Sequence, residues 1–186
     1  MKIVYDYKVF LHQKIGGPSR YFVELIKELI KINNDISVYS PVYINEYLNL
    51  LDKKHVKGVF FKNKKYVGKL LKIYNDISSK IFFSKNNLDI LHTTYYDNVN
   101  FTNKPIVITV YDLIHEIFSK EFNFNLLPKK DIFKRADHFI CISKNTQKDL
   151  IKYYGIEEKK TSVVYLSSFN KPNFSTEKFG LLKLER

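Results

Sequence analysis

The segment GGPSRYF, residues 16–22, follows a short apolar run and opens an amphipathic helical pattern. Adjacent glycines let a ligand approach the backbone closely, and the start of a helix presents unpaired N–H groups and the positive end of its dipole. Gly16 and Gly17 are therefore candidate contacts for a diphosphate, with Arg20 one turn into the helix as a charged partner. The same residues also suit a simple strand-to-helix turn, because neither GxGxxG nor GK[ST] is present.

Two further segments place histidines close to the ends of apolar runs. His92 ends the run in LDILHTTYYD, and Asp112 and His115 follow the run in PIVITVYDLIHEIF. Ligands of open α/β sheets bind at the carboxyl ends of the strands, so these side chains would share a cleft. A lone histidine at a strand end is also a common structural hydrogen-bonding group. No HExxH spacing predicts a zinc site, and no GxSxG predicts a nucleophile elbow.

The elements that would position these residues alternate along the chain. Short β-branched and aromatic runs are followed by longer helix-like segments, which predicts βα units and a parallel sheet. Strands are expected at 2–6, 36–40, 59–61, 88–92, 106–111, 138–142 and 162–165, and helices at 18–33, 43–53, 66–83, 127–136 and 144–154. Pro18 suits a first helical turn, and Ser143 and Gly155 suit the two ends of the last helix.

Composition narrows the class of partner. The net charge of +12 indicates an anionic one, but lysine supplies nearly all of it, since only Arg20, Arg135 and Arg186 are arginines. Specific phosphate and base recognition favours the arginine fork, which argues against a nucleic-acid partner. An anionic substrate or membrane surface stays compatible with the charge. The lysine-rich stretch 53–72 is either a solvated surface or a contact for anionic lipid headgroups.

Compartment and redox state are also indicated. No apolar run approaches the roughly 20 residues that cross a bilayer, and MKIVYDYKVF lacks the features of a signal peptide. The single cysteine, Cys141, excludes an internal disulfide and a CxxC metal site, and its setting in FICIS predicts a buried thiol. The expected place of work is the cytoplasm, including peripheral contact with the inner membrane.

Four segments together resemble the glycosyltransferase family 4 enzymes of bacteria, in the same order: GGPSRYFVELIKEL, DILHTTYYD, PIVITVYDLIHEIF and ADHFICISKNTQKDLIKYYGIEEKKTSVVYLS. The closest likeness is to mannosyltransferase-like members. The resemblance implies half of a GT-B fold: a Rossmann-like α/β domain with an open, mostly parallel sheet and helices on both faces. Residues 1–168 would form the N-terminal, acceptor-side domain, and residues 169–186 would begin the linker to a donor-binding domain that this chain lacks.

The resemblance also implies roles at matching positions. Gly16 and Gly17 match a loop that faces the donor diphosphate, and His92 matches a histidine that hydrogen-bonds the donor sugar near the reacting carbon. Asp112 and His115 match a His-Asp region in which Tyr111 replaces the commoner histidine. The matching residues assigned to the cleft wall or to acceptor binding are Gln13, Arg20, Tyr21, Tyr95, Asp112 and His115.

The implied activity is a retaining transfer of a hexose, with mannose from GDP-mannose as the closest match, to a glycan or lipid-linked acceptor. The products would be surface polysaccharides such as O-antigen or capsule. The nucleotide sugar is the co-substrate, and no cofactor or metal is expected. His92 would orient the sugar and not act as a strong base, and this half alone is expected to transfer little. Alternatives are a non-catalytic Rossmann-type module that holds a nucleotide or sugar and, with less support, a nucleic-acid-binding protein.

Overall fold

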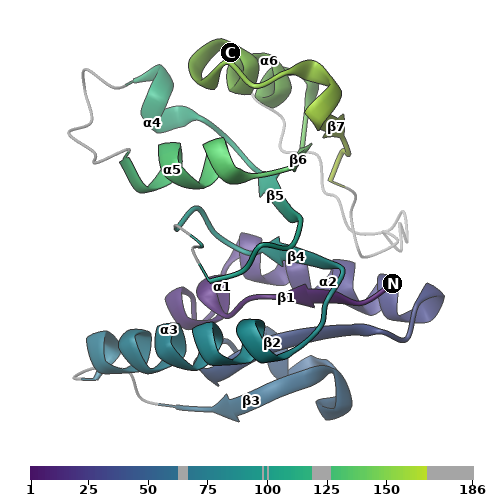
Figure 1. Cartoon of the computed structure of the whole chain (residues 1–186), viewed down its shortest axis with the longest axis vertical. Coiled ribbons are helices and arrows are strands. Elements are labelled where there is room, and N and C mark those ends of the chain that lie inside the picture. The colour runs from purple at the N-terminus through teal and green to yellow at the C-terminus, as the bar shows by residue number, and fades with distance from the viewer. Residues whose placement is uncertain (63–66, 98, 100, 119–126, 167–186) are drawn as a thin grey trace, which may run out of the picture.

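The computed structural model describes residues 1–62, 67–97, 99, 101–118 and 127–166. Within them, seven strands form one sheet in the order β3-β2-β1-β4-β5-β6-β7, and each neighbouring pair is parallel (Figure 1). The strands are β1 (Ile3–Tyr5), β2 (Ile36–Tyr43), β3 (Val56–Phe60), β4 (Ile90–Thr93), β5 (Ile106–Val110), β6 (His138–Cys141) and β7 (Thr161–Val163). The α-helices are α1 (Lys8–His12), α2 (Gly17–Ile32), α3 (Gly68–Lys85), α4 (Ile114–Ile117), α5 (Leu127–Arg135) and α6 (Lys144–Tyr154).

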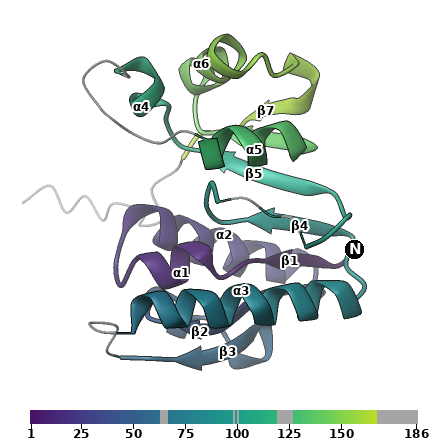
Figure 2. The ribbon, with the colours of Figure 1, turned by 60° about the vertical axis from the view of Figure 1, so that its left-hand side comes forward.

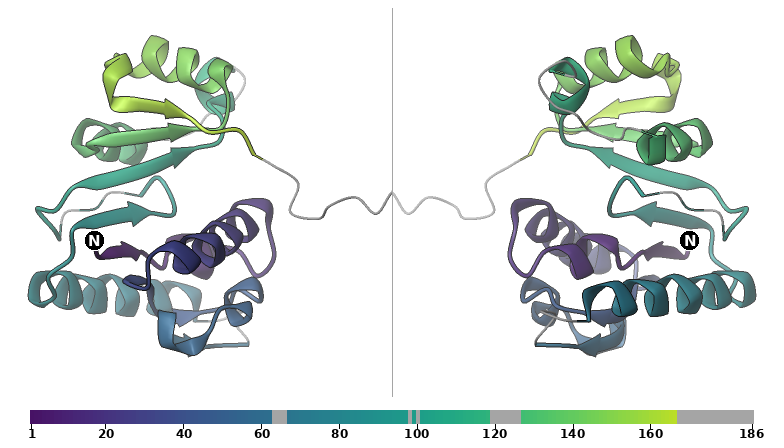
Figure 3. Two further views of the ribbon diagram at one scale, coloured as in Figure 1. Left: turned by 90° about the vertical axis from the view of Figure 1, so that its right-hand side faces the viewer. Right: turned by 90° about the vertical axis from the view of Figure 1, so that its left-hand side faces the viewer.

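Helices cover both faces of this sheet (Figures 1 and 3), and the neighbouring β1 side chains Val4 and Tyr5 pack in different apolar clusters. On one face, Tyr5 of β1 and Val38 of β2 pack in a cluster with Phe22 of α2. On the other face, Leu91 of β4 packs in a cluster with Phe83 of α3 and with side chains of α5 and α6. The predicted open α/β sheet with helices on both faces is therefore confirmed, and its described strands are all parallel.

Strand β1 lies where the order of the strands reverses. The chain runs from β1 outward through β2 to β3, and then places β4 on the other side of β1 before it continues outward to β7. Tyr5 of β1 consequently pairs with Val38 on one side and with His92 on the other. Ligands bind outside the carboxyl ends of the strands at such a reversal, so the loops after β1 and β4 are where a site is expected.

The helix expected at 43–53 does not form. Strand β2 continues to Tyr43, and two short 3-10 turns follow, η1 (Tyr47–Leu50) and η2 (Lys53–His55). Asn45 provides the physical reason, because its amide donates to the Gln13 carbonyl at 2.7 Å and accepts from the Leu48 N–H at 3.0 Å. A short polar side chain that bonds to nearby backbone competes with a regular helix.

Other boundaries differ less from expectation. Strand β3 begins at Val56, three residues before the expected strand, and the short helices α1 and α4 were not predicted. Cys141 is fully buried, as predicted. The expected domain end at residue 168 and the linker at 169–186 lie outside the described residues.

Candidate functional site

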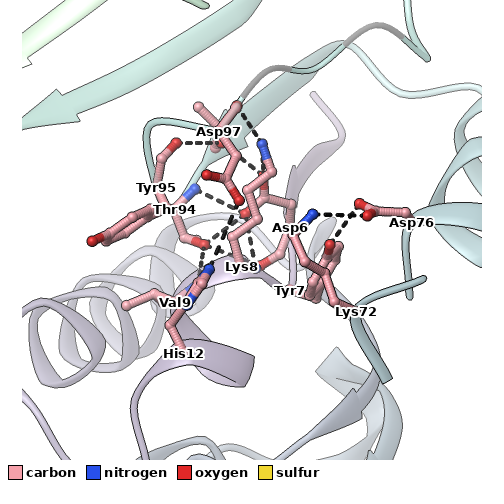
Figure 4. Close-up of polar contacts among 11 residues, drawn as sticks. Asp6, Tyr7, Lys8, Val9, His12, Lys72, Asp76, Thr94, Tyr95 and Asp97 are labelled. Carbon is pink, nitrogen blue, oxygen red and sulfur yellow. Dashed lines mark hydrogen bonds and ion pairs between the residues drawn. The ribbon is translucent and has the colours of Figure 1, made fainter. Parts of the chain in front are cut away.

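A buried carboxylate, Asp6, follows β1 at the reversal point (Figure 4). It accepts hydrogen bonds from the Thr93 hydroxyl at 2.7 Å, from the Thr94 N–H at 2.9 Å and from the Thr94 hydroxyl at 2.6 Å. The Lys8 ammonium lies 3.7 Å from the same carboxylate and donates to the Asp97 carbonyl at 2.5 Å. We call these five residues the loop network, because their bonds hold the loop after β1 against the loop after β4.

The loop network contains an ion pair between Asp6 and Lys8 that is buried from solvent. Lys8 is only 1% exposed, and burial lowers the pKa of its ammonium, while the carboxylates of Asp6 and Asp97 oppose that change. Buried charges persist in proteins when they are paired and hydrogen-bonded, and such pairs fix geometry more than they add stability. The loop network therefore fixes the position of the loop after β1 relative to the loop after β4.

The partly exposed side chain of Asp97, a member of the loop network, lies next to those of His12 and Tyr95. The rings of His12 and Tyr95 stack with their centres 5.1 Å apart, and His12 Nε2 lies 3.8 Å from the Asp97 carboxylate. The neighbouring His12 imidazole is the main cause that holds the pKa of Asp97 below its ordinary value. We call His12, Tyr95 and Asp97 the ring surface. An exposed flat ring next to a carboxylate offers a sugar both an apolar face for its C–H groups and an acceptor for its hydroxyls.

The glycine segment forms the start of α2. Gly16 is the N-cap, and the Ser19 N–H donates to Gln13 Oε1 at 3.3 Å, which ties the preceding loop to the first helical turn. A Cβ at Gly16 would collide with the Gln13 amide, whereas a Cβ at Gly17 would meet no atom within 4 Å. Neither glycine has a positive φ. Packing and backbone geometry therefore do not require glycine at position 17, and the space in front of this helix end is open.

His92 is buried instead of facing the cleft. It is 4% exposed, and its ring centre lies 4.9 Å from that of Tyr5 and 5.4 Å from that of Phe22. Burial lowers the pKa of the imidazole to about 3, so the ring is neutral at physiological pH. Its Nε2 lies 3.0 Å from the Thr109 hydroxyl, a group that also interacts with Tyr21. His92 is therefore linked to the half-buried Tyr21 indirectly, through Thr109 and Phe22, and its contact with a donor sugar stays a prediction.

The loop after β5 reaches the same edge of the sheet. Asp112 and His115 are exposed, and Asp112 Oδ1 accepts from the Ile114 N–H at 3.3 Å. The ring of Tyr111 packs edge-on against that of Tyr21 with the centres 5.6 Å apart. The Tyr111 hydroxyl is buried and has no hydrogen-bond partner among the described residues. Two of the segments that carry the family resemblance thus touch through these tyrosines.

The sequence interpretation overlooked Asp6, Lys8 and Asp97 and made no claim for His12. The available signal was the charged YDYK that directly follows a predicted strand, at residues 5–8. Its partners lie more than 80 residues away in the sequence, so their spacing could not reveal the contact.

The described residues hold no metal cluster, and a hollow at the opposite edge of the sheet does not change the placement of the candidate site at the carboxyl ends of the strands. In the part of the chain that the structure describes, no group of three His, Cys, Asp or Glu side chains could hold a metal ion. A hollow of about 610 Å³ lies between the end of α3 and the loop before β5, lined by residues such as Lys80, Asn87 and Lys104. It is at the amino ends of β4 and β5, away from the edge where sheets of this kind bind ligands.

An all-parallel sheet with polar loops gathered at its reversal point defines a doubly wound α/β domain. The chain belongs to Glycosyltransferase Family 4, because the model of that family matches residues 15–166. The family predicted from four sequence segments is confirmed, while its mannosyltransferase-like and bacterial character stays a prediction. No curated protein matches the chain.

Two solved structures align with this chain. The apo form of the lipopolysaccharide outer core galactosyltransferase WaaB aligns with a TM-score of 0.54 and 16% identity, over 89% of this chain and 45% of its own. A glycosyltransferase from Rickettsia africae ESF-5 aligns with a TM-score of 0.49 and 18% identity, over 88% of this chain and 42% of its own. The chain thus spans less than half the length of either protein, and the likeness to WaaB shows a shared fold.

Proposed function

We propose that this chain is the acceptor-side domain of a retaining glycosyltransferase that moves a hexose from a nucleotide sugar to a glycan or lipid-linked acceptor in surface polysaccharide synthesis. The observation that carries the proposal is the meeting of the loops after β1, β4 and β5 at the sheet reversal, in a chain of Glycosyltransferase Family 4. Mannose from GDP-mannose is the first donor to test. A galactosyl nucleotide is the second, because the structural neighbour WaaB is a galactosyltransferase.

In this proposal the open start of α2 receives the donor diphosphate. The Gly17 N–H and the helix dipole stabilise negative charge as the bond from the sugar carbon to the diphosphate oxygen breaks, and exposed Arg20 adds a positive charge one turn away. The acceptor hydroxyl forms the new bond on the same face of the sugar, and its proton passes to the leaving diphosphate. Neutral His92 holds Thr109 and thereby Tyr21 in place, and it transfers no proton.

The proposed activity is tested by incubating the full-length gene product with a panel of nucleotide sugars and measuring nucleotide release with and without a lipid-linked glycan acceptor. Release that depends on one donor and on the acceptor supports a transferase. Tight binding of a nucleotide sugar with no turnover under any condition favours the non-catalytic module. Binding to DNA that weakens steeply with salt, without sugar-nucleotide binding, would favour the nucleic-acid alternative.

Substitution of Gly17 by valine is expected to lower kcat/KM for the donor about a hundredfold or more, because the side chain fills the space in front of the helix end. The fold should persist, since the position has a negative φ and no neighbouring atom within 4 Å. Steady-state kinetics and thermal unfolding check the two halves of this expectation. Gly17→Ala should give an intermediate loss, and wild-type kinetics for Gly17→Val would remove Gly17 from the donor site.

Tyr95→Ala is expected to raise the acceptor KM about three- to tenfold, because one stacked aromatic contact contributes about 0.5–1.5 kcal/mol. The donor KM should not change, since the ring surface lies apart from the start of α2 in this proposal. Tyr95→Phe keeps the ring and should restore the acceptor KM. An equal loss for Tyr95→Phe would show that the phenol oxygen, and not the ring face, makes the contact.

A further inference from the structure

Helix α3 buries polar side chains against the sheet. Asn75 and Ser79 are both fully buried, and Phe83 is the one large apolar side chain of this helix that is buried. The Asn75 amide accepts from the Val42 N–H at 2.9 Å and donates to the Val42 carbonyl at 2.8 Å, so it holds the helix on β2 by polar contacts. A surface helix of a globular protein normally shows the opposite pattern, with apolar residues inward.

The outward face of α3 is apolar. Five large side chains on this face are each more than half exposed to solvent: Leu70 at 65%, Ile73 at 54%, Tyr74 at 55%, Ile77 at 57% and Ile81 at 51%. Their spacing of three and four residues places them on one side of the helix. We call them the α3 stripe. Single exposed apolar residues are ordinary, but a continuous row marks an interaction surface. Figure 2 shows α3 along the outside of the sheet.

The charges around the α3 stripe define its occupant. Lys69, Lys80 and Lys85 are exposed on the same helix. The one acidic residue of α3, Asp76, is bonded to Lys72 at 2.9 Å and to the Tyr7 hydroxyl at 2.6 Å. A second copy of this chain would bring these lysines face to face, in a protein of net charge +12. The complement of an apolar stripe with a basic border is a surface with an apolar interior and anionic headgroups.

We propose that the α3 stripe docks on an anionic phospholipid bilayer, with α3 lying in the plane of the interface. The five apolar side chains would enter the headgroup region while the lysines contact lipid phosphates. No helix among the described residues is long and apolar enough to cross a bilayer. The Asp76–Tyr7 bond joins α3 to the loop after β1, so docking would also hold the proposed site near a lipid-linked acceptor, a consequence that rests on the proposed function.

The chain contains no tryptophan, which allows a direct test of the surface. Tyr74→Trp introduces a single reporter in the α3 stripe, and Tyr153→Trp on α6 provides the matched control at a tyrosine that is 38% exposed. With vesicles of phosphatidylglycerol, the emission of the first variant should shift to the blue, while that of the control should not. Absence of a shift, or an equal shift with phosphatidylcholine vesicles, would overturn the assignment to an anionic bilayer.

Paired substitutions locate the contact independently. Ile73→Glu combined with Ile77→Glu should weaken sedimentation of the full chain with phosphatidylglycerol vesicles about tenfold or more. Two apolar side chains that would enter the bilayer are then replaced by negative charges, which the anionic headgroups repel. Ile32→Glu on α2, at a residue that is 83% exposed, should bind like the wild type. Circular dichroism checks that each variant is folded.

Two outcomes of the sedimentation experiment would overturn the proposal: unchanged vesicle binding of the double variant, or a wild-type dimer that the double variant converts to monomer. The second outcome would assign the α3 stripe to a copy of this chain. Because no sugar donor is present in either experiment, the results are independent of whether the protein transfers a sugar.

Discussion

Replacement of Asp6 by alanine is expected to lower the free energy of unfolding by about 3–5 kcal/mol, the range measured when one member of a buried ion pair is removed. Asp6 is fully buried and accepts hydrogen bonds from Thr93 and from both donors of Thr94. Alanine removes the acceptor for all of them and the carboxylate that lies 3.7 Å from the Lys8 ammonium. Chemical denaturation at neutral pH measures the change.

Two companion variants separate this effect from a general loss of charge. Asp6→Asn keeps the shape and one acceptor oxygen but not the charge. Its free energy of unfolding should therefore lie between those of the wild type and of Asp6→Ala. Glu28→Ala removes a carboxylate that is 63% exposed and paired with Lys31 on α2, and it should change stability by no more than about 0.5 kcal/mol. If Asp6→Ala is no more destabilised than Glu28→Ala, the loop network does not hold the two loops together.

Local signals in the sequence predicted much of the fold. Ser143 accepts from the Thr146 N–H at the start of α6, and Gly155 ends that helix with a φ of 65°. Pro18 lies in the first turn of α2, as expected. Each of these features depends on residues within about one helical turn, which is the range over which capping and turn preferences act. The predicted alternation of strands and helices then sufficed to indicate the parallel sheet.

Contacts between distant segments escaped prediction. The lysine-rich stretch 53–72 was interpreted as a solvated surface or a lipid contact, and residues 63–66 of it lie outside the described part of the chain. The surface proposed here for lipid lies mostly beyond this stretch, from Leu70 to Ile81. Its apolar spacing is that of a helix whose apolar face packs on a sheet. The pairing of Asn75 with Val42 and the exposure of the apolar side chains show that the helix is turned the other way.

In the candidate site, too, local sequence signals placed some residues, whereas contacts between distant segments escaped prediction. The glycine segment, His92 and the Asp112 loop could be placed at strand ends from their neighbours in the sequence. The sequence could not show that His92 points into the core, because that depends on Phe22 of α2 covering its ring. Nor could it show that Asp6 pairs with Lys8 and the threonines after β4, which requires the sheet order.

Lowering the pH from 7 to 5 is expected to cost the wild-type protein about 2 kcal/mol of stability through His92 alone. Burial lowers the pKa of the folded imidazole to about 3, while an unfolded histidine titrates near 6.5. Between these values the unfolded state binds a proton that the folded state does not, so stability falls as the pH falls. The loss is about 1.4 kcal/mol for each pH unit below 6.5, and urea denaturation at pH 7 and pH 5 measures it.

The comparison that isolates this contribution uses His92→Gln, which keeps a polar group near Thr109 but has no ionisable ring. Its difference in stability between pH 7 and pH 5 should be smaller than that of the wild type by about 2 kcal/mol. Because His92 stays neutral throughout this interval, the rate of sugar transfer should show no ionisation that belongs to it. A step in the rate near pH 6.5 that disappears in His92→Gln would contradict the buried, neutral ring.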